Sequence, residues 1–285
     1  MVGKDNFLTS RIKALHGGKP PAEILARVQE KRFEHLLRDR RLEREKHGKS
    51  ARERITKARA PIIRQLLADP DSAAAIKEFQ KKKFAPRPFK KISQPIPSFT
   101  SDIRSGSILT FVGPPYDFTI GWSAGPGLQF HQSDVATGAF AVLADGGGGY
   151  TDAVAGVGMF FNPVKDCLLR VSAYTPYNWS YALQAGFFAA HSDGYFGWLI
   201  TNATDQVDVF SSYDSIFSRG VGWFDSAEDS GSGFYQVQPL VFVQGGKWYR
   251  INLYCQVSVD DNFTYSFGDG NISGKAGFFV FEQFI

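Results

Sequence analysis

The sequence predicts a mainly β protein in which an antiparallel, jelly-roll-like β-sandwich follows an N-terminal basic helical arm. Residues 1–91 hold 25 Lys and Arg against 11 Asp and Glu (+14), whereas residues 92–285 hold 7 against 17 (−10). Aromatic residues, glycine and β-branched residues also concentrate after Pro97, a composition typical of sheet. The two halves are therefore expected to meet different partners.

A connector separates these halves. Residues 81–97, KKKFAPRPFKKISQPIP, carry four prolines and five lysines, which favour an extended, solvated chain. We therefore expect a helical arm over residues 1–85, a Pro/Lys-rich linker over 86–97 and a sandwich domain over 98–285.

The arm is expected to contain short amphipathic helices. One begins near Pro20 and ends at Gly48, and a second begins at the capping box that opens with Ser50. Pro61 either kinks that helix or begins another, and Asp69 precedes the last one. The apolar seam is narrow, so the helices should depend on packing against the β domain, a second copy or a partner.

The β region contains short segments of apolar and aromatic residues separated by turn residues, as in a sandwich or barrel. In the clearest of them, Trp248–Val259, apolar and polar residues alternate between an inner and an outer face. The predicted strands are Ser107–Val112, Asp117–Trp122, Thr137–Ala144, Ala153–Phe161, Cys167–Tyr174, Tyr181–Ala190, Gly194–Asn202, Val207–Tyr213, Tyr235–Val243, Trp248–Val259 and Gly274–Phe284.

Two cysteines, Cys167 and Cys255, are too few for a disulfide framework or a zinc site. Both fall on the predicted inner face of a strand. Buried free thiols are favoured over a redox role, and the sequence leaves open whether the two pair.

The densest basic patch lies at the connector. Its side chains suit phosphate groups or an acidic protein surface, and binding of this kind is independent of nucleotide sequence and sensitive to salt. The patch consists of Lys81, Lys82, Lys83, Arg87, Lys90 and Lys91. Nucleic acid, an acidic scaffold and further copies of the chain in an oligomer are the expected partners.

Catalytic signatures are weak. Ser192, His191 and Asp193 supply the residue types of a hydrolase triad, but adjacent residues rarely converge on one reacting atom. A second carboxylate group, Asp225, Glu228 and Asp229, lies in a segment expected to be an exposed loop. We therefore expect neither enzymatic activity nor a cofactor.

Several Asp and Asn residues offer the hard oxygen ligands that Ca²⁺ prefers, but none has the spacing of a known calcium loop. Turn formation at strand ends explains the same residues, so no metal site is predicted. The sets considered are Asp205 with Asp208, Asp225 with Glu228 and Asp229, Asp260 with Asp261 and Asn262, and Asp269 with Asn271.

Aromatic residues near predicted turns are the better candidates for binding. Tyr177, Trp179, Trp198 and Trp223 lie beside turn-forming and polar residues. Such rings either stack on sugars, anchor a protein interface or cover the ends of the core.

The layout resembles that of virion proteins in which a basic arm precedes a jelly roll. Together with the charge division and the lack of catalytic motifs, it favours a non-enzymatic structural or recognition component of a larger assembly. A glycan-binding module and a hydrolase built on the sandwich are the alternatives. No apolar run approaches the roughly 20 residues of a membrane span, and no secretory signal is expected, so the localisation stays open.

Overall fold

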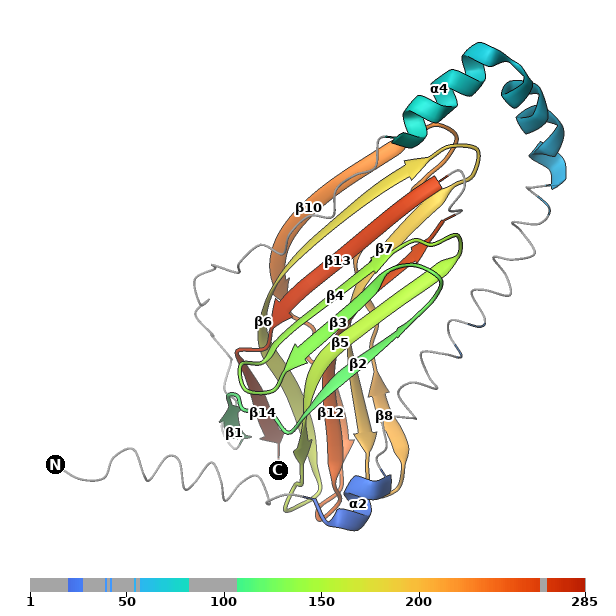
Figure 1. Ribbon diagram of the computed structural model, residues 1–285. Coiled ribbons are helices and arrows are strands. Elements are labelled where there is room, and N and C mark those ends of the chain that lie inside the picture. The colour runs from blue at the N-terminus through green and yellow to red at the C-terminus, as the bar shows by residue number, and fades with distance from the viewer. Residues whose placement is uncertain are drawn as a thin grey trace.

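The computed structural model describes residues 20–27, 39, 42, 54, 57–81, 107–261 and 266–284. Their main body is a sandwich of two antiparallel sheets, which confirms the predicted fold class (Figure 1). Helix α2 (Ala22–Arg27) lies at one end of the sandwich, and α4 (Pro70–Lys81) lies at the other.

The first sheet has eight strands, and β6 runs through its centre. Its members are β1 (Ser107–Val112), β3 (Gln129–Asp134), β4 (Ala139–Asp145), β6 (Cys167–Ala185), β10 (Ser226–Tyr235), β11 (Leu240–Val243), β13 (Ser266–Lys275) and β14 (Phe278–Phe284). The second sheet has six strands: β2 (Phe118–Ala124), β5 (Tyr150–Phe161), β7 (Ala190–Asn202), β8 (Val207–Ser211), β9 (Asp214–Val221) and β12 (Tyr249–Asp260).

The 19-residue strand β6 pairs with two successive strands along each edge. β10 and β11 follow one another along one edge, and β13 and β14 along the other. Each of these successive pairs can be counted as one strand, and so can β8 and β9, which both pair with β7. With β10, β13 and β9 standing for their pairs, the strand order is β4–β13–β6–β10 in one sheet and β5–β12–β7–β9 in the other. The chain crosses between the sheets in the manner of a jelly roll, which β1, β2 and β3 extend.

The core lies between the two sheets. Trp198, Tyr249 and Phe161 are among its largest fully buried side chains, and Phe161 stacks on Phe281 at 5.1 Å between ring centroids. Ring pairs of this kind add to the free energy of burial. Cys167 and Cys255 both belong to this core, as the strand pattern predicted, and they are unbridged, a point that the sequence left open.

The helical region matches the predicted start of its last helix. The backbone N–H of Ser72 donates to Oδ2 of Asp69 at 2.9 Å, so Asp69 caps α4, and Pro70 occupies the first turn. That hydrogen bonding also lowers the pKa of the Asp69 carboxyl. Residues 57–68 are helical on both sides of Pro61.

β13 was not predicted apart from its last two residues, Gly274 and Lys275, and three further strands were missed: β3, β9 and β10. Each of these three lies at a sheet edge and carries polar residues on both faces, so neither alternation nor apolar content marks it. The turn expected between residues 174 and 181 is also wrong, since β6 continues through it with β10 on one side and β13 on the other.

Candidate functional site

The structure tests little of the predicted basic patch. Lys81 is the last residue of α4, and its side chain is not described. Lys82, Lys83, Arg87, Lys90 and Lys91 lie outside the described residues. Their role as a docking patch stays a prediction.

Three of the four candidate aromatic residues do not lie in loops. Tyr177 and Trp179 belong to β6 and face the core, where Tyr177 packs on Phe196 at 5.0 Å and Trp179 on Phe217 at 5.3 Å between ring centroids. Trp198 lies in β7 and is fully buried. The prediction of a loop site failed here because the Pro-Tyr-Asn sequence was interpreted as a turn, whereas sheet pairing on both edges holds it extended.

Trp223 is the one member of this set on the surface. It lies in the turn between β9 and β10, is 42% exposed, and has a left-handed backbone (φ 42°), as does Phe224 (φ 52°). Bulky residues seldom adopt this conformation, so the surrounding contacts must hold it. The guanidinium of Arg59 lies 4.8 Å from the Trp223 ring centroid, and Phe224 packs edge-on against Phe187 at 5.2 Å.

The candidate hydrolase triad is divided between two faces of β7. The Nε2 atom of His191 lies 2.9 Å from Oδ1 of Asp193, on the face away from the core. Ser192 points inward, since its Oγ occupies the space that a Cβ on Gly270 would fill. Successive side chains of a strand face opposite sides, so Ser192 cannot receive a proton relay from this pair.

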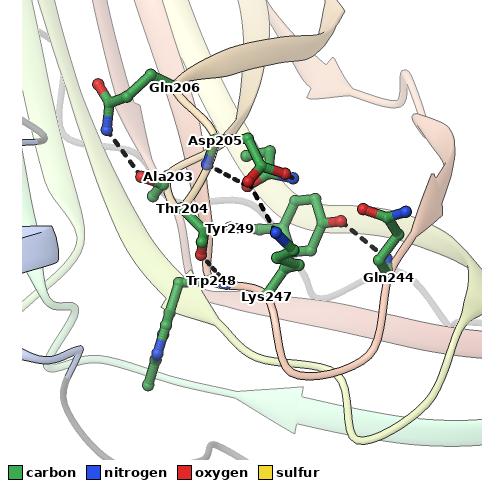
Figure 2. A network of polar contacts seen from close by, with 9 residues as sticks. Ala203, Thr204, Asp205, Gln206, Gln244, Lys247, Trp248 and Tyr249 are labelled. Carbon is green, nitrogen blue, oxygen red and sulfur yellow. Dashed lines mark hydrogen bonds and ion pairs between the residues drawn. The ribbon is translucent and has the colours of Figure 1, made fainter.

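Asp205 and Asp208 have structural partners. The Asp205 carboxylate accepts hydrogen bonds from Asn202 Nδ2 at 2.9 Å and from Lys247 Nζ at 2.8 Å, and Asp208 accepts one from Thr201 Oγ1 at 2.8 Å. Figure 2 shows that the Asp205 network joins the turn after β7 to the turn before β12. Asp205 therefore holds two turns together, and Asp208 links β8 to β7.

The other predicted loop carboxylates are mostly in strands. Glu228 and Asp229 lie in β10, with Asp225 just before it, and Asp269 and Asn271 lie in β13. Asn262 lies outside the described residues. Within the described ranges, no three His, Cys, Asp or Glu side chains are placed to hold a metal ion.

Asp261 is held in a cradle of backbone N–H groups. Its Oδ1 accepts from the N–H of Gly148 and its Oδ2 from that of Gly268, both at 3.0 Å. The carboxylate fills the space that a Cβ on Gly146 would need. The pKa of the Asp261 carboxyl is raised to about 6, chiefly by burial. The two N–H groups oppose this shift, and the charges of Asp145 and Asp260 add to it.

An exposed apolar patch lies on the outer face of the eight-stranded sheet. Leu168 of β6 is opposite Phe242 of β11 on one side and Phe284 of β14 on the other, and Leu240 lies two residues along β11. Leu168, Leu240 and Phe242 are 45%, 51% and 57% exposed. These four residues are called the apolar patch below.

An ion pair borders the apolar patch. Arg170 Nη1 lies 3.0 Å from Oε2 of Glu282, and the Arg170 guanidinium is 5.1 Å from the Phe284 ring centroid. The sequence held a signal for the patch, since the alternation around Cys167 places Leu168 on the outer face. The partners of Leu168 were not predictable, because pairing of β11 and β14 with β6 joins residues far apart in the chain.

Two of the described helices, α2 and the helix at 57–68, pack against the ends of the sandwich. Ile24 of α2 packs on Phe160 and Trp248, and the Asp205 network holds the turn that carries Trp248. At the opposite end, Ile63 and Leu66 of the helix at 57–68 pack on Phe187 and Phe188. Arg59 Nη1 donates to the carbonyl of Phe187 at 3.1 Å. Both helices therefore pack against the β domain. This is one of the three packing surfaces that the narrow apolar seam predicted, beside a second copy and a partner.

No family model matches this sequence, and no curated protein matches it either. Among solved structures, a family 29 carbohydrate-binding module with cellulohexaose is 13% identical at a TM-score of 0.23, covering 63% of this chain and 93% of the other. A xylan-binding domain of carbohydrate-binding family 22 is 15% identical at a TM-score of 0.22, and the match covers 55% of this chain and 86% of the other. A chain in a structure of infectious bursal disease virus is 8% identical at a TM-score of 0.17, and the match covers 67% of this chain and 44% of the other. Scores this low assign neither a family nor a ligand. Among the described residues, no helix is long and apolar enough to cross a bilayer.

Proposed function

We propose that this protein is a non-enzymatic structural component of a larger assembly, in which the sandwich contacts further copies through the apolar patch. The observation that supports this most is the exposure of Leu168, Leu240 and Phe242 side by side on one sheet face. Clustered apolar side chains on a soluble domain mark interaction surfaces, whereas scattered ones do not. In the described part of the chain, β11 pairs on one side only, so a sheet edge adjoins the patch.

The absence of catalysis is part of the proposal. Its support is the separation of Ser192 from His191 and Asp193, the most complete set of hydrolase residue types in the sequence. The basic connector, including Lys81, Lys82 and Lys83, completes the proposal as the contact to an acidic scaffold or packaged nucleic acid.

Light-scattering mass tests the assembly. The wild-type mass should exceed the 31.6 kDa of one chain and rise with protein concentration. Replacing Leu240 and Phe242 by Ser should return the protein to the mass of one chain, because exposed side chains contribute to association more than to folding. Val164→Ser is the matched control, since Val164 is 81% exposed but lies outside the patch. A wild-type protein that stays at one chain at every concentration would contradict the proposal.

Glycan binding is the second candidate, and Trp223 is the observation that favours it. Its ring is exposed in a turn whose backbone conformation is unusual, although Arg59 already covers it at 4.8 Å. A glycan array compares wild type with Trp223→Ala. Binding that disappears in the variant would support this candidate, and no bound sugar in the wild type would remove it.

A further inference from the structure

The outer face of the six-stranded sheet is buried, although it faces away from the inter-sheet core. In β12 the alternate residues Tyr249, Ile251 and Leu253 belong to that core, so the residues between them belong to the opposite face. On that face a second apolar cluster, formed from four strands, is 5% exposed or less. It comprises Ile120, Val154, Leu199 and Tyr254.

Polar groups on the same face are buried too. Asp152, Asn252 and Ser258 are each 1% exposed, and Gln256 is 6% exposed. Among the described residues, Oδ1 of Asn252 and Oε1 of Gln256 have no hydrogen-bond partner. A central strand whose outer face met water would keep such groups in contact with solvent, so something covers this face.

Two of the described helices contact the sandwich at the two ends of this face. Ile24 of α2 contacts Phe160 and Trp248 beside the first residues of β12. At the other end of β12, Asp260 is opposite His191. His191 lies three residues after Phe188, and the helix at 57–68 packs on Phe187 and Phe188. Figure 1 shows α2 at one end of the sandwich, opposite the end where the helical segment leading into α4 lies. Residues 28–56 connect these two contacts.

Length fits this connection. The 12 residues of β12 span about 40 Å at ~3.3 Å per residue. The 29 residues from 28 to 56 span about 43 Å at the helical rise of ~1.5 Å per residue. Within that segment, the described positions 39, 42 and 54 are helical.

Charge fits as well. On the outer face, near the end of β12 that carries Asp260, lie three carboxylates with His191 beside them: Asp152, Asp193 and Asp260. Arg250 lies on the same face near the other end, over the Phe118 ring at 4.4 Å. Residues 28–56 hold ten Lys and Arg against six Asp and Glu, a net charge of +4. We propose that residues 28–56 of this chain bind to the outer face of the six-stranded sheet, with their basic side chains toward these carboxylates.

Limited trypsin digestion tests this, because the segment offers ten cleavage sites. In the full-length protein at low salt, cleavage within 28–56 should be slow, and high salt should accelerate it at least tenfold. Asp152→Asn with Asp193→Asn should have the same effect at low salt. The matched control is Asp225→Asn with Asp229→Asn, which should leave the cleavage rate unchanged. Both carboxylates are exposed and lie away from this face, Asp225 in the β9–β10 turn and Asp229 in β10.

A second measurement reads the sheet rather than the segment. Hydroxyl-radical oxidation of Trp122 and Tyr213, which border the outer apolar cluster, should rise severalfold when the segment is released. Phe130, an exposed residue of β3 in the other sheet and outside the apolar patch, should not change. If the Asp152 variant fails to fold, replacing Arg38, Arg40, Arg41 and Arg44 by Gln leaves the sandwich intact and should give the same two effects.

The outcomes separate cleanly. Slow cleavage that is independent of protein concentration, together with a rise in oxidation on release, supports the proposal. Protection that disappears on dilution would overturn it in favour of a second copy. Rapid cleavage of the wild-type segment at low salt would overturn it outright. None of these outcomes depends on the apolar patch, so this inference and the proposed assembly succeed or fail separately.

Discussion

The guanidinium of Arg59 lies 4.8 Å from the centre of the Trp223 ring, although the two residues are 164 positions apart in the chain. The same side chain donates to the Phe187 carbonyl. One residue of the basic region thus bridges two turns of the β domain. This contact makes the helix at 57–68 part of the folded body.

Arg59→Ala should weaken that contact without unfolding the sandwich. Loss of the cation–π contact and the hydrogen bond should remove roughly 1–2 kcal/mol of docking free energy. Amide hydrogen exchange in residues 57–68 should accelerate about 5- to 30-fold, while exchange in β12 stays unchanged. Arg64→Ala, an exposed residue of the same helix, is the control. Equal exchange in both variants would show that Arg59 does not hold the helix.

Asp261 should make stability fall as pH rises. Its pKa is about 6 in the folded protein against 3.8 for an ordinary Asp, so the folded state favours the protonated carboxyl. The resulting stability is fully present below pH 3.8 and is lost as pH rises through about 6. The difference is at most about 3 kcal/mol.

Urea unfolding across this pH range measures the effect. Asp261→Asn should remove the corresponding slope, because the amide does not ionise. Asp225→Asn, which changes an exposed carboxyl, should retain it. A wild-type stability that does not change between pH 4 and 7 would contradict the buried-acid assignment.

Gly156→Ala should strongly destabilise the fold. A Cβ at this position would lie 2.2 Å from the Leu253 carbonyl oxygen of the neighbouring strand, and backbone cannot move aside as a side chain can. The expected loss is roughly 1–3 kcal/mol or more. Gly222→Ala is the matched control, since nothing lies within 4 Å of the added atom. Thermal melting of both variants should show a clear decrease for the first only.

Both cysteines should be inert in the native protein. Burial raises the pKa of the Cys167 and Cys255 thiols, so little reactive thiolate forms. A thiol reagent should label neither before denaturation and both afterwards, with or without prior reduction. Two thiols that appear only after reduction would indicate a disulfide instead.

The sequence allowed much of the fold to be predicted, because alternation identifies strands with one face in the core. β1 matches its predicted bounds, and β12 matches to within one residue at each end. β10 was interpreted as a loop, since its Ser, Gly and Asp residues carry no such signal and its strand conformation comes from pairing with β6. Periodicity also placed Tyr254 on an outer face but gave no indication that this face is buried.

The candidate site was less predictable for the same reason. Trp179 and Trp198 were placed near turns by their neighbours in sequence, but tertiary packing puts them against the core. The apolar patch depends on Leu168 meeting Phe242 and Phe284, residues that only long-range pairing brings together. Local patterns identify which residues are unusual, whereas sheet register decides which of them become neighbours.

The position of β13 has a consequence for how the chain acquires its structure. This strand lies between β4 and β6, more than a hundred residues from β4 in sequence. During synthesis, β4 and β6 are made long before the strand that joins them, so their facing edges wait unpaired while the rest emerges. Folding should therefore be slow, with a rate set by this late insertion, and the nascent chain should depend on chaperones until residues 266–275 arrive.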